Sequence, residues 1–302
     1  MIVKVKEPQP SEYDYLQEGQ FLFCYLHLAP DPKQAKALVQ KKVVAVAYET
    51  VTGYDGRLPL LVPMSEIAGR IAVQAGANAL HMASGGRGVL LGGVPGVLPG
   101  NVVVIGGGIV GTEAMRMAIG LGADVTIFDR SLPRLRALDQ LFAPKIKTVF
   151  STQAHLEKAV ADADLVIGAV LLPGKTAPKL ITRSMLKKMK PGSVIVDVAI
   201  DLGGCTETSR PTTHSDPTYV EEGIVHYCVT NIPAACARTA TQGLTNATMP
   251  YALHMANVGY RKAILDDPNL QLGLNVCYGK VTNQEVAADL RYEYVPPVQV
   301  LR

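Results

Sequence analysis

A glycine-rich turn is the first pattern in the sequence whose residue types and spacing could do chemistry. Gly106, Gly108 and Gly111 follow the β-branched run 102–105 directly. Glycine at these positions permits a tight turn, lets the backbone approach a pyrophosphate and lets a helix pack closely on a strand. Asp129 ends the next apolar run, 23 positions after Gly106, where an acid can accept hydrogen bonds from a ribose diol. The pattern therefore predicts a dinucleotide site that takes NAD rather than NADP.

The sequence on either side of the turn decides how specific this pattern is for a dinucleotide site. A GxGxxG alone is weak evidence, because glycines also serve ordinary turns. Here it lies between two apolar runs and precedes a helical pattern, whose N-terminus would offer free N–H groups to phosphates. The alternative for Asp129 alone is an N-cap of the following helix.

The elements that must position this turn alternate regularly from residue 101 onward. Apolar runs predict six strands, at 102–105, 125–128, 146–150, 165–170, 194–198 and 224–228. Helical patterns follow the first four strands: one ends near residue 121, and the others cover residues 133–141, 154–161 and 182–189. Strands that alternate with helices in this way predict an α/β fold with a doubly wound Rossmann sheet.

The rest of the chain predicts a second α/β domain, into which the Rossmann domain is inserted. Residues 1–59, the first part of this substrate domain, hold apolar runs typical of strands at 2–6, 21–28 and 43–48 and a helical pattern at 32–40. Residues 60–238 hold the Rossmann domain and a connecting helix that we expect to begin with a cap at Ser65. Residues 239–302 form the C-terminal part of the substrate domain, which we expect to be helical.

Composition excludes several classes of protein. With 302 residues, 48% hydrophobic and 18% charged, the chain is an ordinary globular protein, and its net charge of +3 is too small to predict a nucleic acid or a membrane as partner. Five cysteines without a CxxC pair favour reduced thiols in a cytoplasmic protein. No segment is long and apolar enough to span a membrane, and the histidines lack metal-ligand spacing, so we assign no metal.

Polar residues beyond the ends of predicted strands are the next candidates, because ligands of an open α/β sheet bind there. They are Ser151, the backbone of 170–171, Asp201 and Asn231. His27 ends an apolar run in the first part of the chain, and a histidine suits the proton transfer that accompanies hydride removal. A hydrogen-bonded structural histidine is the alternative for His27.

The polar stretch 197–219 would lie near the nicotinamide half of a bound dinucleotide. It is rich in Gly and Thr and holds Asp197, Asp201, Glu207 and Arg210. Loops on a rigid scaffold often hold functional groups, although a plain surface loop is the alternative here.

Longer matches show a resemblance to the alanine dehydrogenase family over essentially the whole chain. The stretches KVKEP (4–8), FCYLHLA (23–29), AYETV (47–51), PLLVPMSEIAGR (59–70) and GGRGVLLGGVPGV (85–97) occur in the family's order. They are followed by VIGGGIVG, DLVIGAVLLPG, MKPGSVIVDVAIDLGGC, TSRPTTHSDPTY and HYCVTNIPAA. Members oxidise L-alanine with NAD to pyruvate and ammonia and run the reverse amination. The resemblance implies the same activity on these small molecules, and a homo-hexamer.

The resemblance also implies roles for individual residues. Lys6 of KVKEP resembles the substrate lysine, His27 of YLHLA the acid/base and Asp201 of AIDLGG its acidic partner. For Lys6, a solvated surface charge is the alternative reading. Asn231 is a further expected substrate contact. The expected cofactor contacts are Ser65, Gly106, Gly108, Ile109, Val110, Gly111, Asp129, Arg134, Ser151, Val170, Leu171, Val198, Ala199, Ile200, Asp201, Arg210, Val229, Thr230, Asn231 and Ile232.

Two departures from the family's pattern leave alternatives open. Members begin with several dozen further residues, which carry an arginine for the substrate carboxylate, so we expect a truncated substrate domain without it. A fragment, a misplaced start and one half of a split enzyme all fit this departure. The positions that some relatives use for a divalent ion are His254 and Val258 here.

Two other functions remain as alternatives to the dehydrogenase. One is a non-catalytic NAD-binding remnant of the enzyme, which keeps the fold without capturing the carboxylate. The other is the α subunit of a nicotinamide nucleotide transhydrogenase. The KVKEP and YLHLA stretches favour the dehydrogenase over the transhydrogenase.

Overall fold

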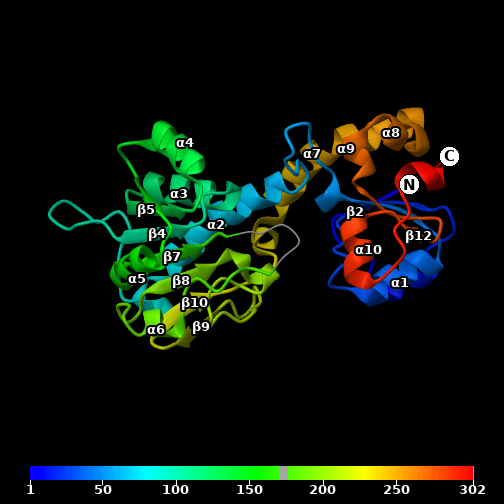
Figure 1. Ribbon diagram of the computed structural model, residues 1–302. Coiled ribbons are helices and arrows are strands. Elements are labelled where there is room, and N and C mark those ends of the chain that lie inside the picture. Colours follow the sequence, from blue (N-terminus) through cyan, green and yellow to red (C-terminus); the bar gives the residue numbers. More distant parts are fainter. Residues whose placement is uncertain (171–175, 302) are drawn as a thin grey trace. The chain divides into compact units, whose positions relative to one another are not determined.

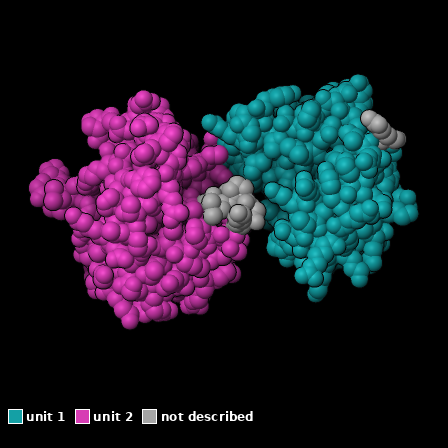
Figure 2. Space-filling view, in the orientation of Figure 1, with its two compact units in different colours: residues 1–64, 241–302 teal, residues 65–240 magenta. Residues whose placement is uncertain are grey.

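The computed structural model describes residues 1–170 and 176–301, which form two compact units (Figure 1). Unit 1 comprises residues 1–64 and 241–302, and unit 2 comprises residues 65–240 (Figure 2). The domain boundaries predicted after residues 59 and 238 lie a few residues ahead of these unit boundaries. The chain passes between the units inside two helices, α2 (Val62–Ala79) and α7 (Ala237–Val258).

Unit 2 is built on a seven-stranded sheet with the order β6-β5-β4-β7-β8-β10-β9. All neighbours pair in parallel except β9, which is antiparallel to β10. The predicted doubly wound sheet is thus confirmed. The seventh strand, β9, was not predicted, and it begins in the last two residues of the stretch 197–219 that we expected to be a loop. The strands are β4 (Asn101–Ile105), β5 (Asp124–Asp129), β6 (Lys147–Phe150), β7 (Leu165–Gly168), β8 (Val194–Asp197), β9 (Thr218–Glu221) and β10 (Ile224–Tyr227).

Alternation along the strands of unit 2 divides their side chains between two hydrophobic cores. Val102 and Val104 pack in one core with α2, α3 (Ile109–Gly120) and α4 (Leu132–Phe142). Val103 and Ile105 pack in the other with α5 (Gln153–Asp162) and α6 (Arg183–Leu186). Figure 1 shows these two pairs of helices, α3 with α4 and α5 with α6, on opposite sides of the sheet. Burial on both faces explains why the strands read as continuous apolar runs.

Unit 1 holds a five-stranded sheet with the order β1-β2-β3-β11-β12. Strands β1 (Ile2–Val3), β2 (Phe21–Cys24) and β3 (Val44–Ala47) lie within the three predicted strand segments and pair in parallel. The prediction of a helical C-terminal part was wrong for two segments, because β11 (Leu274–Cys277) and β12 (Lys280–Val281) complete this sheet. The four apolar-rich residues of β11 are too few to show a period, so sequence alone did not separate them from a loop.

Helices cover both faces of the sheet in unit 1. One core joins the sheet to α7, α8 (Tyr260–Asp266), α9 (Pro268–Gln271) and α11 (Pro297–Leu301). The other joins it to α1 (Pro32–Gln40) and α10 (Gln284–Leu290). No helix among the described residues is both long and apolar enough to cross a membrane.

One predicted helix start was wrong. We expected Ser65 to cap the connecting helix, but α2 begins at Val62 and places Ser65 on its first turn. Pro63 is tolerated there because the first helical N–H groups have no partner inside the helix.

Candidate functional site

The glycine turn between β4 and α3 has the geometry of a phosphate cradle. Gly106 has a left-handed backbone, with φ at 102°, and a side chain at Gly111 would come within 1.8 Å of the Gly106 carbonyl oxygen. At Gly108 a Cβ would meet no atom within 4 Å, so the backbone faces open space. Gly108 is also the N-cap of α3 and provides no side chain to bond the first N–H groups of that helix. These groups are therefore available to an anion.

Asp129 at the end of β5 and Arg134 in the first turn of α4 hold this turn. Asp129 Oδ2 accepts a hydrogen bond from the Gly107 N–H at 2.7 Å, and Oδ1 accepts one from the Ser131 N–H at 2.7 Å. Arg134 Nε donates to the Gly107 carbonyl oxygen at 2.5 Å, and Nη2 donates to Thr112 Oγ1 at 2.6 Å. Ser131 caps α4, so the alternative reading of Asp129 as N-cap was wrong. A carboxylate has about four lone-pair sites, which leaves two on Asp129 for a ribose diol.

A cavity of about 430 Å³ opens at this edge of the sheet, within unit 2. A cavity at the carboxyl ends of parallel strands is where the fold binds its ligands. The predicted cofactor residues that line it are Ser65, Gly106, Gly108, Ile109, Val110, Asp129, Ser151 and Val170. Leu171 lies outside the described residues. The lining residues that the sequence did not single out are Ile105, Phe128, Arg130, Ala169, Pro178 and Leu180. Only Arg130 had a signal, because it follows the predicted ribose acid.

A buried carboxylate organises the loop that follows β8. Asp197 is fully buried and accepts hydrogen bonds from the N–H groups of Ala199, Cys205 and Thr206 and from Ser209 Oγ. The 3₁₀ helix η4 (Val198–Leu202), inside this loop, carries the predicted contacts Val198, Ala199, Ile200 and Asp201. The backbone of residues 197–209 is thus fixed around one buried acid, whereas residues 213–216 are exposed, as a plain surface loop would be.

Asp201 and Asn231 lie together within unit 2. The Asn231 N–H donates to both carboxylate oxygens of Asp201, at 3.2 and 3.3 Å. Asn231 has a left-handed backbone, with φ at 51°, and precedes η5 (Ile232–Cys236). Of the predicted contacts at 229–232, Asn231 thus binds Asp201 of η4. Val229 and Ile232 are buried in the core.

Arg210 lies over a stack of two rings. Its guanidinium carbon is 4.1 Å from the centroid of Tyr219, whose ring stacks on His226 at 4.9 Å between centroids. His226 Nδ1 donates to the Ile224 carbonyl oxygen, so Nε2 accepts from Thr208 Oγ1. Burial lowers the pKa of His226 below its usual 6.5, which favours the neutral ring.

Lys6 and His27 belong to unit 1. His27 is exposed, has a left-handed backbone with φ at 48°, and stacks its ring on Tyr25 at 5.8 Å between centroids. Lys6 Nζ is 3.5 Å from Glu7 Oε2, and its side chain is about half exposed. Both side chains are thus open to a ligand, and the solvated-charge alternative for Lys6 remains open on this geometry.

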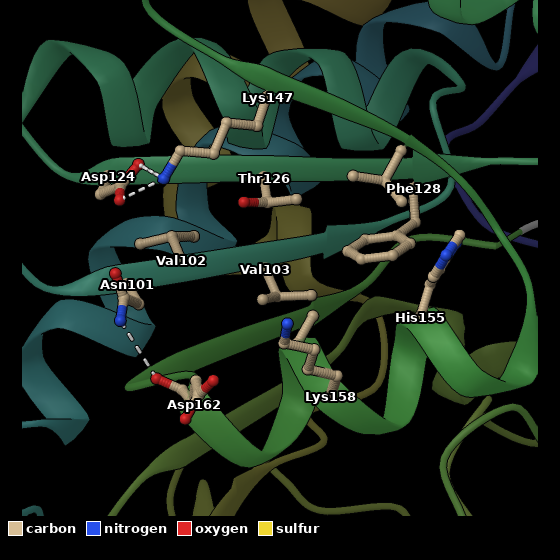
Figure 3. A pocket seen from close by; sticks show the side chains of 12 residues that line it. Asn101, Val102, Val103, Asp124, Thr126, Phe128, Lys147, His155, Lys158 and Asp162 are labelled. Atoms are coloured by element: carbon tan, nitrogen blue, oxygen red, sulfur yellow. Dashed lines mark hydrogen bonds and ion pairs between the residues drawn. The ribbon is translucent and has the colours of Figure 1, made fainter.

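A second cavity of unit 2, of about 490 Å³, lies along the sheet rather than beyond its carboxyl edge (Figure 3). It is lined by residues of β4, β5, β6 and α5. Lys147 forms an ion pair with Asp124 at 2.5 Å, and Asn101 Nδ2 donates to the Asp162 carbonyl oxygen. No described residue that we predicted for the site lines this cavity, so it is not the candidate site.

The described residues contain no group of three or more His, Cys, Asp or Glu side chains that could hold a metal ion. His254 and Val258, the two positions at which we expected the divalent-ion site of some relatives, both lie on α7.

Comparisons with known proteins show which family the chain resembles. The model of the alanine dehydrogenase/PNT N-terminal domain matches residues 1–68, and that of the C-terminal domain matches residues 72–284. The alanine dehydrogenase of Halomonas elongata is 57% identical over 301 residues, which are 100% of this chain and 81% of that protein. The alanine dehydrogenase of Bacillus subtilis is 57% identical over an alignment of 304 positions, which covers 100% of this chain and 80% of that protein.

Solved structures give the same result. A structure of an L-alanine dehydrogenase matches with a TM-score of 0.93 and 52% identity, over 95% of this chain and 80% of the other. A transhydrogenase from Sinorhizobium meliloti matches with a TM-score of 0.81 and 22% identity, over 93% of this chain and 81% of the other, and so shares the fold. Both family models match the chain, and more than half of its residues are identical to those of the Halomonas elongata and Bacillus subtilis enzymes. The chain therefore belongs to the alanine dehydrogenase/PNT family.

Proposed function

We propose that this chain is an NAD-dependent alanine dehydrogenase, which converts L-alanine to pyruvate and ammonia and runs the reverse amination. The observation that carries the proposal is the 57% identity, over the whole chain, to relatives named alanine dehydrogenase. The chain is accordingly an oxidoreductase.

The cradle of unit 2 supports NAD as the cofactor. Gly108 leaves space for a pyrophosphate, and Asp129 keeps lone pairs for a ribose diol. The negative charge of the Asp129 carboxylate would repel the extra phosphate of NADP. Bound there, NAD would supply the ring that accepts a hydride from Cα of alanine.

The chain's own residues supply charge and proton transfer. Lys6 holds the substrate oxygens and offsets the negative charge that develops on them. His27 takes a proton from the water that adds to the imino carbon of the oxidised substrate, and returns it to the nitrogen that leaves as ammonia. Asp201 takes part in this acid–base chemistry, and Asn231 fixes its carboxylate through the backbone N–H.

The proposal also covers the setting of the enzyme. We place it in the cytoplasm as a homo-hexamer that acts on small molecules, without a nucleic acid or a membrane as partner. The five free thiols fit a reducing compartment, and the small net charge fits the absence of polyanionic partners. The hexamer rests on the family resemblance.

The direct test is NADH formation from L-alanine at alkaline pH. We expect turnover in the wild type and a loss of roughly 100- to 10,000-fold in kcat in His27→Ala, because a general acid/base contributes about that much. NAD binding, measured by calorimetry, should be unchanged in that variant. His81→Ala, at an exposed histidine outside the site, is the control. A wild-type chain that binds NAD but never reduces it with L-alanine would overturn the proposal in favour of a non-catalytic remnant.

The choice of cofactor has its own test, at Asp129. In Asp129→Ala, we expect KM for NAD to rise by about tenfold or more, because both the ribose acid and the support of the glycine turn are lost. Discrimination against NADP should relax, which steady-state kinetics with both cofactors would measure. Asp139→Ala, at an exposed acid of α4, serves as the control. An unchanged preference for NAD would show that Asp129 is misassigned.

A further inference from the structure

The turn that follows β2 is held by the carboxylate of Glu49, which lies just after the end of the neighbouring strand β3. Glu49 Oε1 accepts hydrogen bonds from the His27 N–H at 2.6 Å and from the Leu26 N–H at 3.1 Å. Glu49 Oε2 is 3.2 Å from the same Leu26 nitrogen. A charged acceptor makes such bonds about twice as strong as neutral ones.

The peptide group between Leu26 and His27 is fixed at both of its ends. Its N–H donates to Glu49, and its carbonyl oxygen accepts a hydrogen bond from Gln34 Nε2 at 3.0 Å. Gln34 is buried in α1, where Asp31 caps the helix and accepts the Gln34 N–H. With both polar atoms bonded, the plane of this peptide cannot rotate without breaking a hydrogen bond.

That peptide precedes a strained residue. His27 adopts a left-handed backbone, with φ at 48°, a conformation that is uncommon for residues with a Cβ and that five other non-glycine residues of the described chain also adopt. The φ angle sets the direction of the Cα–Cβ bond, so the left-handed conformation decides where the imidazole points. Its ring lies against Tyr25, whose hydroxyl donates to the Leu60 carbonyl oxygen at 2.6 Å.

Glu49 is itself well placed by the fold. Cys24 of β2 pairs in register with Ala47 of β3, so the two parallel strands end at the same edge of the sheet. The 3₁₀ helix η2 (Tyr48–Thr50) begins there and carries Glu49 on its second residue. Tyr48 anchors η2, because it is buried and packs edge-on against Phe23 and Tyr25.

We propose that Glu49 is a positioning residue for His27, holding its backbone in the left-handed conformation that presents the imidazole for proton transfer. This inference rests on the acid–base role of His27 proposed above. Glu49 acts through two backbone N–H groups and does not need to touch the substrate. Misplacing a catalytic group by about 1 Å can slow a reaction by roughly 100-fold, which sets the size of the expected effect.

A double-mutant cycle tests the inference. Glu49→Ala should lower kcat by roughly 10- to 100-fold with KM for NAD unchanged, and Glu49→Gln should recover part of the loss because its amide oxygen can still accept the His27 N–H. In a His27→Ala background, Glu49→Ala should cost nothing further, because no imidazole is left to orient. Asp267→Ala is the matched control. It removes another carboxylate of unit 1 that accepts a backbone N–H, that of Asn269 at 2.9 Å.

Amide hydrogen exchange gives a readout that does not depend on turnover. The amides of Leu26 and His27 should exchange at least about tenfold faster in Glu49→Ala and at the wild-type rate in Asp267→Ala. Unchanged exchange in Glu49→Ala, or a full additional loss of kcat in the double variant, would overturn the inference alone. Full activity of His27→Ala would instead overturn the acid–base role, and the inference with it.

Discussion

Two carboxylates, one in each unit, hold the loops that carry the proposed acid–base residues. Glu49 of unit 1 binds the turn with His27, and Asp197 of unit 2 binds the loop with Asp201. Both acids lie at or just beyond the end of a parallel strand and accept backbone N–H groups. They differ in reach. Asp197 bonds residues 2 to 12 positions further along its own loop, whereas Glu49 bonds residues 22 and 23 positions away on a neighbouring segment.

This difference in reach indicates different roles for the two acids, although both accept backbone N–H groups. Asp197 is fully buried and its partners all belong to one loop, so that loop folds around it. Glu49 is partly exposed and contacts a turn whose neighbours, Leu26 and Leu28, are already buried in a core. We therefore expect Asp197 to matter mainly for stability and Glu49 mainly for rate.

The largest expected effect is on the stability of unit 2 in Asp197→Ala. Three backbone N–H groups and one hydroxyl would lose their buried acceptor, and each unsatisfied buried donor costs about 1–3 kcal/mol when water cannot replace the partner. With partial relaxation, the free energy of unfolding should fall by about 3–5 kcal/mol. Urea unfolding followed by circular dichroism measures this loss, and hydrogen exchange of residues 198–210 should show where it acts.

Asp164→Ala is the control for that experiment. Asp164 is another buried acid of unit 2, and it accepts the Asn101 N–H at 2.9 Å and a hydrogen bond from Arg87. Its loss should destabilise the unit while exchange in 198–210 stays at the wild-type rate. If Asp197→Ala were as stable as the wild type, or if Glu49→Ala destabilised the chain more than Asp197→Ala, the contrast between the two acids would be wrong.

A smaller effect should come from pH, through His226 of unit 2. Burial holds the pKa of His226 below its unfolded value of 6.5, so the unfolded chain binds this proton more readily than the folded one. Stability from the neutral ring is therefore present above about pH 6.5 and is lost as pH falls below it. The charged groups that bear on the ring are Glu221, Asp197 and Arg210.

His226→Gln should flatten this dependence. We expect the wild-type melting temperature to fall by on the order of a few degrees more than that of His226→Gln between about pH 7.5 and about pH 5.5. His155→Gln, at an exposed histidine of the same unit, should melt with the wild-type pH dependence. Parallel curves for wild type and His226→Gln would remove His226 as a source of pH dependence.

Sequence reasoning succeeded where a pattern is local. The glycine turn is signalled within one βαβ unit, because turn, helix and second strand have fixed spacings. Six of the seven strands of the Rossmann sheet are signalled by their own apolar runs. It failed for β11, whose four residues pair with β3 from the other end of the chain. It also gave no role to Glu49. This residue follows β3 but binds the turn after β2, and such a hydrogen bond between distant segments has no characteristic spacing in the sequence.

The pairing of β3 with β11 has a consequence for synthesis of the chain. Unit 2 is one continuous stretch and can fold once residue 240 has left the ribosome, whereas the sheet of unit 1 lacks its β11 neighbour until residues 274–277 emerge. During that interval β3, all four residues of which are buried in the finished protein, has an open edge able to pair with another chain. The order of translation thus makes unit 1, the part that holds His27, the last to mature and the one most dependent on protection from aggregation.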